Sequence, residues 1–162
     1  GKTTYRNNWQ VTAKTCDGET YIYTKGNVDL GQLKQLIAGV EGVEHIYDGA
    51  EAVKLGADPK CTFLVEAKDG YYFTDEVNRL AVVEDVDPDS LGTHDRYQGV
   101  HGYGPNKPGY FTTAVFVGPD INQGATVAGA HLVDEGPTFA QLLGLHYPAP
   151  TAGQPIAGVV RK

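Results

Sequence analysis

The chain has 162 residues, 41% of them hydrophobic, and a formal net charge of −7 at pH 7. This apolar content can fill the core of one ordinary domain or two small ones. The basic residues are scattered singly, which excludes the basic stripe of a nucleic-acid-binding surface, and no apolar run approaches the roughly 20 residues that cross a bilayer. A small or metal-complexed ligand is therefore expected, and the lack of methionine indicates a piece of a longer protein.

Two strands joined by a tight turn are predicted near the start of the chain. Apolar and more polar residues alternate over 9–15, and aromatic and β-branched residues dominate 19–24. Asp17-Gly18 between them is typical of a two-residue hairpin turn. The first secondary structure is therefore expected to be an antiparallel pair.

A helix is predicted from Leu30, where apolar residues begin to recur at helical spacing. Asp29 lies three residues before Gln32, which is the spacing of a capping box, and Gly39 can end the helix. The helix is expected to pack on the sheet through two sets of apolar residues: Leu33, Leu36, Ile37 and Val40 on the helix, and Ile22, Phe63 and Val65 on strands.

The rest of the first half is predicted to contain a short strand at 45–47, a weak helix over 50–55 and two strands, 61–68 and 71–75. Asp69-Gly70 between the last two strands is a hairpin signal. Strands on either side of a helix, followed by a hairpin, are reminiscent of a ferredoxin-like α+β lobe.

A polar connector over 84–98 separates this lobe from the rest, and we place the domain boundary there, dividing the chain into 1–93 and 94–162. The nearly continuous β-forming run Tyr110–Val117 predicts a strand buried in a layered sheet. A helix is predicted downstream, with Pro137 in its first turn, Phe139, Leu142 and Leu143 on its buried face and Gly144 at its C-terminal cap. One strand and one helix cannot bury themselves, so we expect a missing N-terminal portion to complete their sheet.

Two segments of the second half carry a family resemblance. Gly99–Tyr103 reads Gly-Val-His-Gly-Tyr, and Val133–Leu145 reads Val-Asp-Glu-Gly-Pro-Thr-Phe-Ala-Gln-Leu-Leu-Gly-Leu. In order and distance they resemble the metal-ligand loop and the closing helix of the type I phosphodiesterase/nucleotide pyrophosphatase branch of the alkaline phosphatase superfamily. The resemblance implies the C-terminal strand-helix portion of an alkaline-phosphatase-like three-layer fold, with 1–93 as an inserted lobe.

The same resemblance implies a two-metal site, usually of zinc, in which His101 binds one ion. A neutral imidazole is a suitable ligand for such an ion, and small neighbours let metal and phosphate approach the backbone. The Thr or Ser nucleophile and the other ligands are expected upstream, in the missing catalytic portion. No catalytic residue is therefore expected in this chain, and the resemblance assigns no substrate-binding residue to it.

The implied function is hydrolysis of phosphoric ester or anhydride bonds in nucleotide-like or phosphodiester substrates by the longer, metal-dependent enzyme. This chain alone is expected to be inactive, because one imidazole cannot assemble a two-metal site. Two alternatives stay open: a non-catalytic binding or interaction module, and another superfamily hydrolase of the sulfatase, mutase or phosphonate hydrolase type. Exposed apolar surface also leaves association of copies open.

The remaining candidates have an ordinary structural interpretation. Four tyrosines of the first half could line a pocket for a planar ligand, but core packing is the more expected role. Solvent exposure is expected for His94-Asp95, and helix capping is expected for Asp134-Glu135. The cysteines are expected to be two buried thiols, with a bridge between them left open. The residues in question are Tyr21, Tyr23, Tyr71, Tyr72, Cys16 and Cys61, with His45, His131 and His146 as structural histidines.

Overall fold

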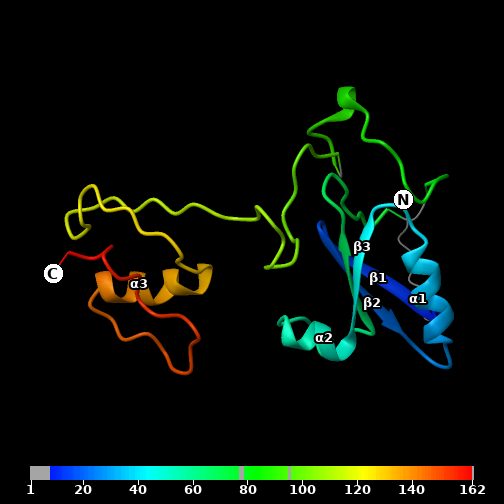
Figure 1. Cartoon of the computed structure of the whole chain (residues 1–162), viewed down its shortest axis with the longest axis horizontal. Coiled ribbons are helices and arrows are strands. Elements are labelled where there is room, and N and C mark those ends of the chain that lie inside the picture. The colour runs from blue at the N-terminus through cyan, green and yellow to red at the C-terminus, as the bar shows by residue number, and fades with distance from the viewer. Residues whose placement is uncertain (1–7, 77–78, 95, 162) are drawn as a thin grey trace. The chain divides into compact units, whose positions relative to one another are not determined.

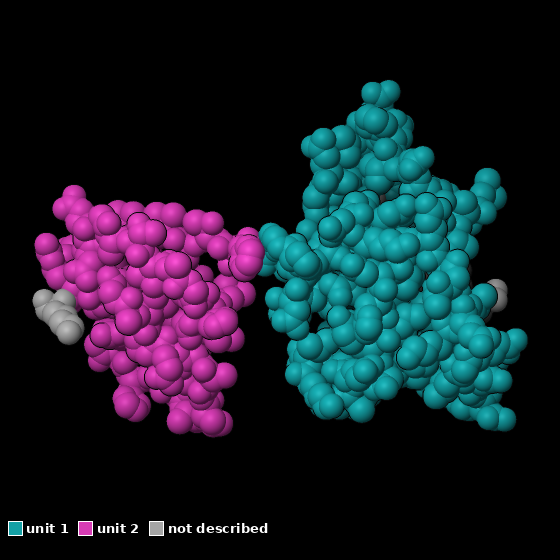
Figure 2. Space-filling view, in the orientation of Figure 1, with its two compact units in different colours: residues 1–110 teal, residues 111–162 magenta. Residues whose placement is uncertain are grey.

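The computed structural model describes residues 8–76, 79–94 and 96–161. The chain divides into two compact units, 1–110 and 111–162 (Figures 1 and 2). The compositional boundary between residues 93 and 94 lies inside the first unit. The reason is that 99–110 is hydrogen-bonded to the sheet of that unit.

Unit 1 is an α+β domain built on a four-stranded antiparallel sheet in the order β1-β2-β4-β3 (Figure 1). The predicted first hairpin is confirmed, with Asp17-Gly18 as its turn and Cys16 opposite Glu19. Its elements are β1 Val11–Cys16, β2 Glu19–Thr24, α1 Leu30–Ala38, β3 Val43–Asp48, α2 Gly49–Lys54, β4 Phe63–Ala67 and the 3-10 turn η1 Pro88–Ser90. This order, ββαβαβ, differs from the βαββαβ order of a ferredoxin-like lobe.

The two helices of unit 1 begin where local signals place them. The Asp29 side chain accepts a hydrogen bond from the backbone N–H of Gln32 at 2.9 Å, which caps α1. Asp48 and Glu51 form a reciprocal capping box at the start of α2. Such caps satisfy N–H groups that have no partner inside the helix.

Each face of the sheet carries its own apolar cluster, because successive residues of a strand point to opposite sides. One cluster comprises Ile22, Phe63 and Val65 with Leu33 and Ile37 of α1 packed against them, as predicted. The other comprises Ala52, Ala57, Cys61 and Leu64 with Tyr21, Tyr23, Tyr47 and Leu55. The predicted packing of Leu36 is wrong, since 72% of it is exposed, and Val40 is not part of the first cluster.

The predicted hairpin strand at 71–75 is wrong, since these residues are in no strand. β4 lies between β2 and β3, so both of its edges are already paired and a following strand has no free edge beside it. The segment crosses the end of β1 instead. The Phe73 N–H donates to the Asp17 carbonyl at 2.7 Å, and the Asp75 carboxylate accepts from the Thr15 N–H at 3.1 Å.

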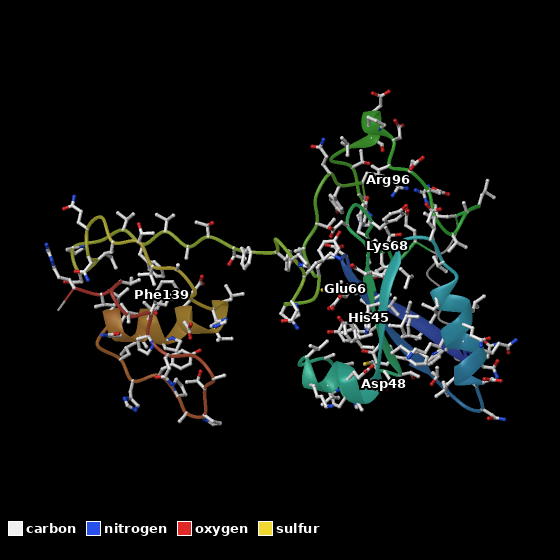
Figure 3. All side chains as sticks on the ribbon, viewed as in Figure 1. His45, Asp48, Glu66, Lys68, Arg96 and Phe139 are labelled. Atoms are coloured by element: carbon white, nitrogen blue, oxygen red, sulfur yellow. The ribbon has the colours of Figure 1, made fainter. Side chains whose placement is uncertain are left out.

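Unit 2 contains the 3-10 turn η2 Leu132–Asp134 and the helix α3 Glu135–Leu142, and Gly144, with φ 65°, follows its C-cap as predicted. The predicted strand Tyr110–Val117 is wrong: this described segment joins no sheet, and Val115 and Val117 are 82% and 91% exposed. Phe116 instead packs against Phe139 of α3, with ring centroids 5.7 Å apart. Figure 3 labels Phe139 on this helix.

The buried face of α3 is formed by Pro137 and Thr138, not by the predicted Phe139, Leu142 and Leu143. The Thr138 hydroxyl donates to the Asp134 carbonyl at 2.7 Å and accepts from the Ile156 N–H at 2.9 Å. The tail of the chain therefore covers the side of α3 that carries these small side chains. No helix among the described residues is long and apolar enough to cross a membrane.

Candidate functional site

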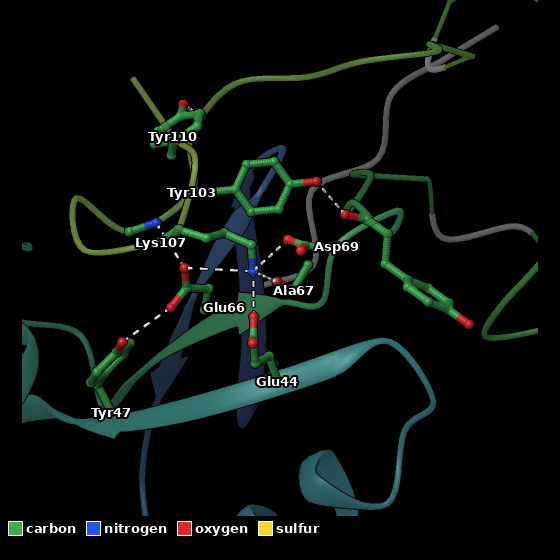
Figure 4. Close-up of polar contacts among 11 residues, drawn as sticks. Glu44, Tyr47, Glu66, Ala67, Asp69, Tyr103, Lys107 and Tyr110 are labelled. Carbon is green, nitrogen blue, oxygen red and sulfur yellow. Dashed lines mark hydrogen bonds and ion pairs between the residues drawn. The ribbon is translucent and has the colours of Figure 1, made fainter. Parts of the chain in front are cut away.

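Residues 99–110, which we call the strap, lie across one end of the sheet of unit 1 (Figure 4). The Gly18 N–H donates to the His101 carbonyl at 2.9 Å, and the Gly104 N–H donates to Oε1 of Glu66 at 3.0 Å. The Tyr103 hydroxyl donates to the Tyr71 carbonyl at 2.6 Å. The strap is thus attached to the β1–β2 turn, to β4 and to the segment after β4.

Glycines allow the strap to approach the sheet this closely. Gly102 has φ 81°, and a Cβ added there would lie 1.8 Å from the Cys16 carbonyl oxygen. A Cβ on Gly18 would lie 2.5 Å from the Tyr103 ring. The glycines around His101 therefore serve contact with the protein's own backbone, and any larger residue at Gly102 would displace the strap.

His101 projects from this fixed backbone. Its side chain is 77% exposed, and its Nε2 lies 3.4 Å from Oδ2 of Asp17 in the β1–β2 turn. A carboxylate beside one ring nitrogen is a common way of orienting a histidine whose other nitrogen is used as a ligand. Among the described ranges no group of three or more His, Cys, Asp or Glu side chains is arranged to hold a metal ion.

A pair of carboxylates lies beneath the strap. Glu19 of β2 and Glu66 of β4 are direct partners in the β2–β4 register. Glu66 is buried and also accepts a hydrogen bond from the Tyr47 hydroxyl at 3.1 Å. Burial is the larger cause and repulsion by Glu66 the smaller one, and together they raise the pKa of Glu19 to about 7. The pKa of Tyr47 is raised to about 12, mainly by burial and secondly by the hydrogen bond to Glu66.

Lys107 of the strap supplies the countercharge. Its side chain is 6% exposed, and its ammonium contacts Glu44, Asp69 at 3.3 Å, Glu66 at 4.0 Å and the Ala67 carbonyl at 2.8 Å (Figure 4). Burial lowers the pKa of Lys107, but hydrogen bonds to Glu44 and Asp69 and the negative charges of Glu44 and Glu66 together raise it overall. The ammonium therefore stays charged among the carboxylates.

A pocket of about 190 Å³ opens between β3 and the strap. Its polar lining includes Glu44, His45, Glu66, Asn106 and Lys107. The carboxylates and the ammonium in this lining already bond to each other or to the backbone. The arrangement is suited to holding the strap on the sheet.

Sequence patterns did not identify Glu19, Glu66 or Lys107. One signal was present: Glu66 interrupts the apolar run Phe63–Ala67, and a charged residue inside a strand with buried neighbours must find partners. The identity of those partners depends on the path of the strap, which no local pattern gives.

The other candidate histidines and tyrosines take structural positions. His45, His94, His131 and His146 are all exposed, and His45 also packs against Tyr47 with ring centroids 4.2 Å apart. Asp95, the predicted neighbour of His94, lies outside the described residues. The predicted core packing of Tyr21 and Tyr23 is confirmed. By contrast, Tyr71 donates to Glu41 and Tyr72 accepts from the Tyr97 N–H.

The predicted capping of α3 by Asp134 is wrong. Asp134 itself has helical φ and ψ, and its carboxylate accepts from the N–H groups of Gln154 and His131, each at 2.9 Å. These bonds hold the pKa of Asp134 below its usual value. The carboxylate thus ties the tail of the chain to η2. Glu135 stands in the first turn of α3.

The prediction of two buried thiols is confirmed for Cys61 and wrong for Cys16. Cys61 is buried, and burial raises the pKa of its thiol, whereas Cys16 at the end of the edge strand β1 is exposed. Both are free thiols, with no bridge between them.

Comparison of the chain with protein-family models, with curated proteins and with solved structures finds no match.

Proposed function

We propose that this chain is the C-terminal segment of a metal-dependent phosphodiesterase or nucleotide pyrophosphatase, and that His101 binds one of its two divalent ions, zinc. The observation that carries the proposal is the contrast at His101. Its carbonyl is bonded to Gly18, while its imidazole is 77% exposed. A ligand held in this way loses little conformational entropy when it meets an ion.

The donor chemistry of the loop fits a zinc ion. Asp17 contacts Nε2 of His101, which leaves Nδ1 for the ion. One imidazole is one ligand, so the remaining ligands would come from the portion of the enzyme that precedes this chain. Two bound ions in such a site stabilise the charge that develops on the attacking alkoxide and on the phosphoryl oxygens.

The proposal also covers the fold to which unit 2 would belong. Unit 2 would belong to an alkaline-phosphatase-like three-layer fold whose sheet is formed mainly by the preceding portion. The exposure of Phe111, Val115 and Val117, at 90%, 82% and 91%, supports this proposal, because a run of exposed apolar residues of β-forming type favours burial against further structure.

The experiment compares metal content and activity in the enzyme that includes the preceding coding segment. His101→Ala should lose one zinc ion and lower turnover of a nitrophenyl phosphodiester by about 100-fold or more, because a missing ligand empties one half of the site. His146→Ala, another exposed histidine, is the matched control and should retain both.

Wild-type zinc content and rates in His101→Ala would contradict the proposal. A preceding segment that lacks both a Thr or Ser nucleophile and further metal ligands would favour a non-catalytic binding module instead. Hydrolysis of sulfate esters or phosphonates in preference to phosphodiesters would move the enzyme to another branch of the superfamily.

A further inference from the structure

The Lys107 side chain joins the strap to three separate parts of the sheet. Its ammonium contacts Glu44 on β3, the Ala67 carbonyl at the end of β4 and Asp69 in the turn after β4 (Figure 4). It also lies 5.0 Å from the centroid of the Tyr103 ring. Because the side chain is 6% exposed, these contacts replace water almost completely.

Glu66 depends on this ammonium. It is a buried carboxylate whose oxygens accept from the Gly104 N–H and the Tyr47 hydroxyl, and Lys107 Nζ is 4.0 Å from Oε1. Glu19 faces it across β2 and β4, and Oε1 of Glu19 has no hydrogen-bond partner in the described part of the chain. Removing the ammonium would leave several carboxylates close together with no countercharge.

The strap carries this attachment to His101. Gly104 and Lys107 follow His101 closely in the sequence, and the Gly102 N–H donates to the Tyr110 hydroxyl at 2.9 Å within the same strap. Gly102 lies so close to the end of β1 that a Cβ there would be 1.8 Å from the Cys16 carbonyl oxygen, so this part of the strap packs directly on the sheet. Release of the strap from Glu66 would therefore shift the His101 backbone away from Gly18.

We propose that Lys107 is a positioning residue: its ammonium holds the strap against Glu66 and the end of β4, and thereby fixes His101 beside Asp17. The attachment of the strap stands independently of what His101 binds. The expected effect of Lys107 on zinc affinity rests on the proposed function, in which His101 binds a zinc ion.

Amide hydrogen exchange of the 162-residue chain tests the attachment. Lys107→Met should speed exchange at the Gly18 and Gly104 amides by about tenfold or more, while amides of β4 that bond to β2 stay protected. The nuclear Overhauser contact between the His101 ring and Asp17 should disappear. Lys68→Met, at an exposed lysine next to the same strand end, is the matched control and should change neither readout.

A second variant covers the case in which Lys107→Met unfolds the sheet. Glu66→Gln combined with Lys107→Met removes both charges but keeps an amide oxygen that can accept from the Gly104 N–H. Part of the lost protection at Gly104 should return in this double variant. Unchanged protection of both amides in Lys107→Met would overturn the proposal. Equal loss of protection in the double variant, with β4 intact, would also overturn it.

Zinc binding by the longer enzyme separates this inference from the proposed function. Lys107→Met should weaken zinc affinity about tenfold, the size of effect expected when the support of a metal ligand is removed. If His101→Ala leaves zinc affinity unchanged, the proposed function fails, and the amide exchange alone decides the attachment. If His101→Ala loses zinc and Lys107→Met does not, the positioning role is overturned.

Discussion

The two units differ in how they bury their residues. In unit 1, β4 is paired on both sides, and each face of the sheet is covered by a helix and apolar side chains. In unit 2, a single helix is covered by the tail, and much apolar surface stays exposed. Unit 1 therefore offers a two-sided core to which a loop can attach, whereas in unit 2 the tail is joined to α3 by hydrogen bonds such as those of Thr138.

The largest expected effect is the loss of a core leucine in unit 1. Leu64→Ala removes a side chain that is 2% exposed and should lower the free energy of unfolding of unit 1 by about 3 kcal/mol. Leu143→Ala in unit 2 removes a side chain that is largely exposed and should cost less than about 0.5 kcal/mol. Urea unfolding of both variants checks the difference, and equal effects would contradict the comparison.

A smaller effect is expected from the polar core of unit 2. Thr138→Val removes the hydroxyl that bonds to the Asp134 carbonyl and the Ile156 N–H, which should cost about 1–3 kcal/mol because the N–H is left buried without a partner. Amide exchange should rise at Ile156 and in α3 but not in β4. Thr112→Val, at an exposed threonine, is the control. Unchanged exchange at Ile156 would show that the tail is held by other contacts.

The pH dependence of unit 1 gives a further test. The pKa of Glu19 is about 7 in the folded state, above its unfolded value near 4.5, so the folded state binds the proton more tightly. The resulting stabilisation is fully present below about pH 4.5 and is lost as the pH rises through 7. Because Glu19 is only partly buried, we expect a loss on the order of 1 kcal/mol.

Glu19→Gln should remove this dependence between pH 5 and 8, as measured by urea unfolding at each pH. Asp58 and Asp75 of unit 1 have lowered pKa values and act in the opposite direction, but only at acid pH, where their protonation lowers the stability of the unit. A slope that persists unchanged in Glu19→Gln would assign the effect to another group.

The smallest effect on stability is expected at the exposed run of unit 2. Val115→Ser combined with Val117→Ser should change the free energy of unfolding by less than about 0.5 kcal/mol but reduce self-association of the chain in sedimentation velocity. Amides of 111–117 should also exchange faster than those of β2 and β4. Uniform protection in a monomer would contradict the contrast between the units.

Local signals predicted the parts of the fold that local interactions determine. Asp17-Gly18 gave the first turn, and Asp29 gave the start of α1, because a turn and a cap involve residues close in sequence. The segment 71–75 has strand composition, but its pairing depends on which edges of β4 are free. That is a property of the whole sheet.

The candidate site divides in the same way. His101 was singled out by its glycine-flanked loop. Its contact with Asp17, and the contact of Lys107 with Glu66, form only when the strap crosses the sheet. Similarly, α3 was predicted from its sequence, but its buried face was not, because the tail that covers Thr138 follows much later in the chain.

The most direct test of the proposed role of His101 is a crystal structure, grown with zinc, of this chain together with the preceding segment that the proposed function requires. We expect a zinc ion at about 2.0–2.1 Å from a ring nitrogen of His101, the usual zinc–imidazole distance, with the strap bonded to Glu66 as described above. Fully loaded zinc sites with the His101 ring in solvent would contradict the account.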